Sequence, residues 1–327
     1  VSDSTVVVLQ NGSPVAMPWL DKVDSVLEAY LSGQAGGSAL ADVVTGKVNP
    51  SGKLTETFPR KVSDIPAYLS WPGENRKSVY HEGVFVGYRY YDFKEIEPLF
   101  PFGFGLSYTT FEYENIEVSN RNITDVDNLN VSVTIRNVGE RAGKEVVQLY
   151  VHDKESDVLR PKKELKGFEK IDLAPGQAKR ITFALAPRDF AYYSTKYNDW
   201  KSDSGEFDIL IGSSSRDIRL SESIFLRSTK SYFQTYDIHS TLKDLMEHPI
   251  GAQFVNRLLQ RSNAKFNTDG MNETEKAAAE KQRKMNQATM LELPLKKVII
   301  LSAGAISENM ILGLLEQMNS KIAENKD

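Results

Sequence analysis

The spacing of hydrophobic residues changes twice along the chain, and this change constrains the fold more than any other feature. From Thr5 to Leu9 the apolar residues are continuous, between about 111 and 226 they alternate with polar residues, and after Arg227 they recur every three or four residues. These spacings are typical of strands buried on both faces, of half-buried strands and of amphipathic helices, respectively. The sequence therefore predicts a multidomain protein of mixed class. We place its parts at 1–64 (α/β), 65–110 (connector), 111–226 (all-β) and 227–327 (helical).

The N-terminal part carries the alternation of strands and helices that is typical of a doubly wound α/β layer. Strands are predicted from Thr5 to Leu9 and within the apolar stretch from Ser25 to Leu31, and a helix from Ser38 to Thr45. The alternating run from Lys53 to Phe58 predicts an edge strand. This makes about three strands, whereas an open sheet usually has about four to six. We expect the absent neighbours of the first strand to lie upstream or in another chain.

The connector is rich in proline, glycine and aromatic residues, notably in Trp71–Asn75, Tyr80–Asp92 and Pro98–Tyr108. It is neither of low complexity nor helical in its pattern. We expect an ordered segment whose rings pack on the flanking domains.

The all-β part predicts a sandwich of about seven strands, of the immunoglobulin-like or fibronectin type III-like kind. Turn signals separate the alternating runs at Asn137–Gly139, Ala174–Gly176 and Ser202–Gly205. The clearest runs are 130–135, 145–151, 178–185, 206–211 and 218–226.

The C-terminal part predicts helices, because its apolar residues follow a helical period between Leu242 and Leu259. A polar helix candidate from Glu275 to Lys284 nearly lacks an apolar face. Two apolar segments follow, from Leu291 to Leu301 and from Ile306 to Met318, and Ser307 is the expected N-cap of the second.

Composition excludes several classes of function. A net charge of -4 gives no electrostatic reason to expect nucleic acid as a partner. No apolar run is long enough for a membrane span or a signal peptide, and the sequence begins with Val1, which suggests processing or a boundary. The four histidines lack the spacing of metal ligands and there is no cysteine, so we expect no metal site. No glycine-rich segment fits a phosphate-binding loop, so we expect no cofactor. Composition leaves the compartment open, and a bacterial cytoplasmic or periplasmic location is favoured only once the resemblance described below is added.

Several blocks of residues, in this order, resemble family 3 glycoside hydrolases, and in particular the β-glucosidases among them. These blocks are Thr5–Val15, Met17–Trp19, Asn49–Leu54, Phe58-Pro59, Glu82-Gly83 with Val86–Asp92, and Pro98–Tyr108. A second group is similar to the fibronectin type III-like domain that ends many members: Asn137–Gly139, Gly143, Glu145–Val151, Pro161 and Leu165–Phe168. The helical part is similar to an extension of some bacterial members.

The resemblance implies a partial α/β/α sandwich, a fibronectin type III-like β-sandwich and a C-terminal helical extension. It also implies a complete enzyme that removes terminal β-D-glucosyl residues with retention of configuration, which needs two carboxylates about 5–5.5 Å apart. In the family the nucleophilic Asp lies in an N-terminal barrel, and the acid/base Glu precedes the strand equivalent to Thr5–Leu9. We therefore expect both upstream of Val1, so no residue here inherits a catalytic role and the chain alone should be inactive.

Two groups of connector residues are candidates for a site. Glu82 and Arg89 could form an acid with its cationic partner, although an ion pair that fixes the loop is the simpler interpretation. A set of aromatic residues could stack on a sugar, although packing is the commoner role of such rings. This set is Trp71, Tyr80, Phe85, Tyr88 and Tyr90. For the outer, leaving-group side of a substrate site we single out Trp71, Tyr80 and Tyr88.

Three hypotheses remain on the sequence alone. The chain is part of a glycoside hydrolase, or a stand-alone fibronectin type III-like binding or assembly module without enzymatic activity, or one product of a split gene. The half-built sheet favours a part of an enzyme. The partners would then be a β-glucoside or oligosaccharide and the absent barrel and half-sandwich, and the chain could also self-associate.

Overall fold

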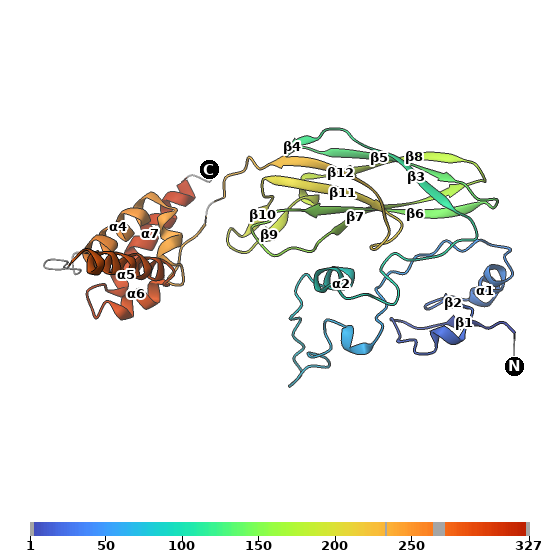
Figure 1. The fold of residues 1–327 in the computed structure, drawn as a ribbon, viewed down its shortest axis with the longest axis horizontal. Coiled ribbons are helices and arrows are strands. Elements are labelled where there is room, and N and C mark those ends of the chain that lie inside the picture. Colours follow the sequence, from blue (N-terminus) through green and yellow to red (C-terminus); the bar gives the residue numbers. More distant parts are fainter. Residues whose placement is uncertain (1–2, 233, 264–271, 325–327) are drawn as a thin grey trace. The chain divides into compact units, whose positions relative to one another are not determined.

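A computed structural model describes residues 3–232, 234–263 and 272–324. It contains two compact units (Figure 1). The first comprises residues 1–193 and 200–230, and the second comprises 194–199 and 231–327. The mixed α/β and all-β class expected from the sequence is confirmed.

The N-terminal part contains two parallel strands and a helix. Strand β1 (Val6–Leu9) pairs with β2 (Ser25–Glu28), with Val6 opposite Ser25. Helix α1 (Gly36–Val44) follows, close to the range that the sequence predicts. A parallel pair joined by a crossover is the element of a doubly wound layer, because parallel strands cannot be joined by a tight turn.

The predicted edge strand from Lys53 to Phe58 is wrong. This segment joins no sheet and instead exchanges backbone hydrogen bonds with the end of the connector. Leu54 N–H donates to the Phe104 carbonyl at 2.8 Å, and Phe58 N–H donates to the Phe100 carbonyl at 2.9 Å. The alternation of polar and apolar residues in this segment arises because one side of it packs on the connector. Phe58 is buried there and packs edge-on against the ring of Phe100.

The connector is mostly turns and extended backbone, but it also contains a short helix that the sequence did not predict. Helix α2 (Tyr88–Lys94) begins after Gly87 and is followed by Glu95, and both of these flanking residues have positive φ. Three of its seven residues are buried, namely Tyr88, Tyr91 and Asp92. Packing of this face, rather than helix propensity, therefore stabilises α2.

The all-β part is a sandwich of two sheets. One sheet has the strand order β4-β12-β11-β6-β7 and the other β3-β5-β8, while β9 and β10 form a separate hairpin. The strands are β3 (Phe111–Val118), β4 (Asn122–Thr124), β5 (Leu129–Asn137), β6 (Gly143–Asp153), β7 (Glu164–Leu173), β8 (Ala178–Leu185), β9 (Tyr192–Ser194), β10 (Asp199–Lys201), β11 (Gly205–Gly212) and β12 (Ile218–Arg227).

The period of two in the sequence becomes an inward-facing core. In β5 every second residue from Leu129 to Asn137 is buried, and β6 and β11 contribute Leu149 and Ile209 to the same cluster. The two sheets bury these side chains between them, as expected for aligned sandwich packing.

The second unit is helical. Its helices are α3 (Leu242–Met246), α4 (Pro249–Asn263), α5 (Glu273–Leu291), α6 (Leu295–Leu301) and α7 (Glu308–Glu324). Leu245, Val255 and Ile311 are fully buried in a core of their own, whereas α5 has no buried residue. Ser307 caps α7 as predicted, because its Oγ accepts a hydrogen bond from Met310 N–H at 3.2 Å. None of the described helices is long and apolar enough to cross a membrane.

Candidate functional site in the aromatic connector

The connector presents two of the three predicted site residues to solvent. The side chains of Trp71 and Tyr80 are 75% and 77% exposed. Leu69 and Val84 beside them in the sequence are exposed as well. Exposed large apolar side chains thus recur along this segment.

Tyr88 has a different environment from Trp71 and Tyr80. It is buried at the start of α2, where its ring stacks on Phe102 with centroids 5.0 Å apart and meets Tyr150 edge-on at 5.8 Å. Its hydroxyl accepts a hydrogen bond from the Leu165 N–H at 2.8 Å. Because both the ring and the hydroxyl are engaged, Tyr88 packs the connector on the sandwich and does not join a sugar-stacking surface.

The expected pair of Glu82 and Arg89 is not present. Arg89 Nη2 instead lies 3.7 Å from Glu164 Oε2, at the start of β7. Oε2 of Glu82 is buried and has no hydrogen-bond partner among the described residues. Gly83 and Gly87 have φ of 56° and 54°, a backbone conformation that glycine adopts without steric cost.

Asp92 on α2 is the most heavily engaged carboxylate of the connector. It is nearly fully buried, and its two oxygens bind different cations. Lys163 Nζ lies 2.6 Å from Oδ2, and Arg216 Nε lies 2.8 Å from Oδ1. Both cations belong to the sandwich, so Asp92 anchors α2 there. Burying a charge is tolerable only when it is paired in this way.

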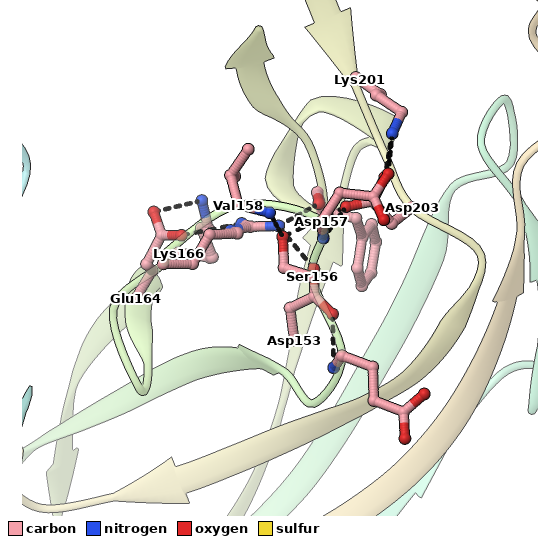
Figure 2. A network of polar contacts seen from close by, with 11 residues as sticks. Asp153, Ser156, Asp157, Val158, Glu164, Lys166, Lys201 and Asp203 are labelled. Carbon is pink, nitrogen blue, oxygen red and sulfur yellow. Dashed lines mark hydrogen bonds and ion pairs between the residues drawn. The ribbon is translucent and has the colours of Figure 1, made fainter. Parts of the chain in front are cut away.

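Glu164 continues this anchoring into the sandwich (Figure 2). It accepts hydrogen bonds from Arg160 at 2.8 Å and from Lys166 at 3.3 Å. Burial by itself would raise the pKa of Glu164, but Lys166, Arg160 and Arg89 together hold that pKa below its ordinary value. Arg160 is itself buried and also binds Asp153 at 2.9 Å, at the end of β6.

A second cation stiffens the same loop between β6 and β7. Lys201 on β10 binds both Asp157 and Asp203, as Figure 2 shows. Burial acts to raise the pKa of Asp203, but its hydrogen bonds from Lys201 and from the Asp157 N–H keep this pKa below the ordinary value. The loop that supplies Lys163 is therefore held by two nearly buried cations, Arg160 and Lys201.

A cavity of about 380 Å³ lies between the end of the connector and the sandwich, and it contains two carboxylates. Glu145 is paired with Lys53 at 3.0 Å and accepts from the Tyr113 hydroxyl at 3.2 Å. Asp217 accepts two hydrogen bonds from Arg219, both at 2.7 Å. Both carboxylates of this cavity are therefore engaged by cations of the same unit.

Within the described part of the chain, no group of three or more His, Cys, Asp and Glu residues is placed to hold a metal ion. Sequence reasoning did not single out Asp92 or Glu164. The only signal for Asp92 was its place in the Val86–Asp92 block, since its cations lie 71 and 124 positions further along the chain.

Fold and site together define the class of protein: a part of a parallel α/β layer, followed by an aromatic connector that packs on a fibronectin type III-like sandwich. Residues 1–88 match the glycosyl hydrolase family 3 C-terminal domain, and residues 145–215 match the fibronectin type III-like domain. The chain belongs to glycoside hydrolase family 3 and corresponds to the C-terminal part of its members.

Individual relatives agree with this assignment. Thermostable beta-glucosidase B of Acetivibrio thermocellus is 51% identical over 320 residues, which is 98% of this chain and 41% of that protein. An exo-alpha-(1->6)-L-arabinopyranosidase of Bifidobacterium breve is 44% identical over 78% of this chain and 33% of its own length. The crystal structure of a Bifidobacterium adolescentis GH3 beta-glucosidase matches with a TM-score of 0.68 and 44% identity, over 76% of this chain and 37% of that one. The chain thus spans about two fifths or less of these relatives.

Proposed function

We propose that this chain is the C-terminal part of a retaining β-glucosidase, and that the nucleophile and the acid/base of that enzyme lie outside it. The observation that carries the proposal is the 51% identity to a thermostable β-glucosidase over 98% of the chain, helical unit included. In this proposal residues 1–64 complete an α/β/α sandwich, 65–110 connect it to the fibronectin type III-like domain of 111–226, and 227–327 form an architectural extension.

The exposed apolar residues of the N-terminal part support this assembly. Val6 and Val8 on β1 are 46% and 40% exposed, although a continuous β-branched strand normally lies between covered faces. The proposed partner is the remaining part of the enzyme, namely a barrel and the first half of the sandwich layer. Its contact would remove from water the apolar area that is now exposed.

Trp71 and Tyr80 are the residues we propose to face the leaving-group side of the substrate. Both are exposed aromatic residues on the same segment, and flat aromatic faces are suited to the apolar faces of sugar rings. The proposed substrate class is a β-glucoside or β-linked oligosaccharide.

A second candidate activity is the release of α-L-arabinopyranosyl residues, which the 44% identical Bifidobacterium breve relative favours. Arabinopyranose is a pentose and lacks the hydroxymethyl group of glucose. The groups that distinguish the two sugars would contact the terminal sugar, whereas Trp71 and Tyr80 are proposed for the opposite side of the scissile bond.

The test compares the 327-residue chain with the full-length enzyme on an aryl β-D-glucoside and an aryl α-L-arabinopyranoside. We expect no turnover above background by the chain alone, because proton transfer and nucleophilic attack need the absent carboxylates. We expect turnover of the glucoside by the full-length enzyme. Activity of the chain alone that is abolished by Glu82→Gln would contradict the proposal.

The site residues are tested in the full-length enzyme. Trp71→Ala and Tyr80→Ala should raise KM for a β-linked oligosaccharide several-fold and leave KM for a small aryl glucoside within about twofold, since each lost stacking contact contributes about 1 kcal/mol. Phe168→Ala is the matched control, because Phe168 is 68% exposed on the sandwich. Equal effects on both substrates would remove Trp71 and Tyr80 from the site.

A further inference from the structure

The exposed segment that carries Trp71 and Tyr80 is clamped at both of its ends. At the N-terminal end, Phe58 exchanges backbone hydrogen bonds with Leu99 and Phe100. At the C-terminal end, the chain enters α2 at Tyr88. A loop with two fixed ends has fewer conformations to lose when it binds a ligand.

The C-terminal clamp consists of three side chains of α2 and the residues they meet on the sandwich. Tyr88 accepts a hydrogen bond from the backbone of Leu165, and Arg89 lies beside Glu164. Asp92 binds Lys163 and Arg216. We call this set the α2 latch: Tyr88, Arg89 and Asp92 on the connector, and Lys163, Glu164 and Arg216 on the sandwich.

The latch is backed by rigid structure. Lys163 and Glu164 lie at the start of β7 and Arg216 lies between β11 and β12, and Figure 2 shows Glu164 beside Lys166. Arg160 connects Glu164 to Asp153 and also donates to the Phe190 carbonyl at 3.1 Å. Arg216 adds a hydrogen bond from Nη2 to the Ile96 carbonyl at 3.0 Å, so it holds both α2 and the second residue after its end.

The N-terminal clamp is also fixed to the sandwich. Gln148 on β6 donates from Nε2 to the Gly103 carbonyl at 3.2 Å, and Ser215 N–H donates to the Phe102 carbonyl at 2.9 Å. Gly103 in turn donates to the Leu54 carbonyl at 2.8 Å. Both ends of the exposed segment are thus tied to one domain.

From these contacts we infer that the fibronectin type III-like sandwich positions the segment of Trp71 and Tyr80 through the α2 latch, and so sets the affinity of the enzyme for the leaving-group part of its substrate. This inference rests on the proposed function, in which that segment borders the substrate. The latch residues do not touch the substrate, so they are positioning residues. Loosening the latch would make the segment more mobile, and the segment would then have to be ordered on binding.

The experiment uses Asp92→Asn in the full-length enzyme, with Glu117→Gln as the matched control. Glu117 forms an ion pair with Arg180 at 2.7 Å on the sandwich, and both side chains are more than half exposed and belong to strands outside the latch. Hydrogen exchange of peptides from 62–86 and steady-state kinetics on an oligosaccharide and on a small aryl glucoside are measured for each variant.

We expect Asp92→Asn to speed exchange in 62–86 at least tenfold and to raise KM for the oligosaccharide at least fivefold, with kcat on the aryl glucoside within twofold. Glu117→Gln should change neither. Unchanged exchange in 62–86, or an equal loss on both substrates, would overturn the inference.

Two further arms keep the result decisive. If Asp92→Asn does not yield folded enzyme, Arg89→Gln weakens the half-exposed edge of the latch and is judged by the same measurements. If the wild-type enzyme cleaves neither substrate, the proposed function fails. Hydrogen exchange then still tests the latch separately: faster exchange of residues 62–86 in Asp92→Asn would support it, and unchanged exchange would reject it.

Discussion

At the scale of single residues, Asn137 shows how a polar side chain can organise a buried corner of the sandwich. It is fully buried, and its amide donates to the Arg141 carbonyl at 2.8 Å and to the Leu173 carbonyl at 3.0 Å. Its side-chain oxygen accepts from Thr109 at 2.7 Å and from Gly139 N–H. Every bonding capacity of the amide is therefore used.

Asn137→Asp should lower the free energy of unfolding of the sandwich by about 3 kcal/mol at pH 7, because the carbonyls of Arg141 and Leu173 lose their donor and face a buried charge. Chemical denaturation followed by tryptophan fluorescence measures this loss. Asn130→Asp, at an exposed position of the same strand, is the control and should be close to neutral. Equal losses in the two variants would contradict this account of Asn137.

Glu164 should make the stability of the sandwich sensitive to acid. Its pKa is lowered in the folded state by Lys166, Arg160 and Arg89, which outweigh burial. The stabilisation is thus fully present above the unfolded carboxyl pKa of about 4.3 and is lost as the pH falls through the lower, folded value. Between pH 6 and 3, Glu164→Gln should lose less stability than the wild type in chemical denaturation. A Glu164→Gln profile that runs parallel to the wild-type profile would show that these cations do not act on the Glu164 charge.

At the scale of elements, one side chain can form with an extended segment the two backbone hydrogen bonds that a neighbouring strand would form. In the helical unit, Asn319 on α7 accepts from Tyr236 N–H and donates to the Tyr236 carbonyl, both at 2.9 Å. This pairing fixes the extended segment ahead of α3 to α7, beside Leu315 and Met318 of the helical core. Helices in proteins are stabilised mainly by packing rather than by propensity, so such contacts between elements stabilise the helical unit.

Asn319→Ala should lower the stability of the helical unit by about 1–2 kcal/mol, because two backbone groups of Tyr236 lose their partners. Thermal unfolding followed by circular dichroism at 222 nm reports on these helices. Asn309→Ala, at an exposed position of the same helix, is the matched control. If both variants melt together with the wild type, the Asn319 contact does not stabilise the unit.

At the scale of the whole molecule, the sandwich has its own core and the N-terminal part does not. All members of the sandwich cluster lie between Phe111 and Leu226, whereas Met17 and Phe58 are the buried hydrophobic residues of the described part of 1–64. Apolar burial is the main favourable term in folding, so the two parts should differ strongly in autonomy.

Residues 111–226 should therefore fold cooperatively when produced alone, and residues 1–60 should not. Limited proteolysis of the 327-residue chain is expected to degrade the N-terminal part well before the sandwich. Equal resistance of the two parts would mean that the N-terminal part is stabilised by contacts beyond those of β1, β2 and α1.

The hydrophobic period by itself determined which segments became strands of the sandwich and which became helices, as at β5 and α7, because period two and period 3.6 place residues on one face regardless of the partner. Tertiary structure decided the partners. Lys53–Phe58 alternates like an edge strand but pairs with the connector, Tyr88 is buried rather than displayed, and Arg89 meets Glu164 rather than Glu82. The hydrophobic period predicts which face of a segment is buried. It does not predict which residues pack on that face, because these lie tens of positions away in the sequence and are determined by packing and charge pairing in the folded chain.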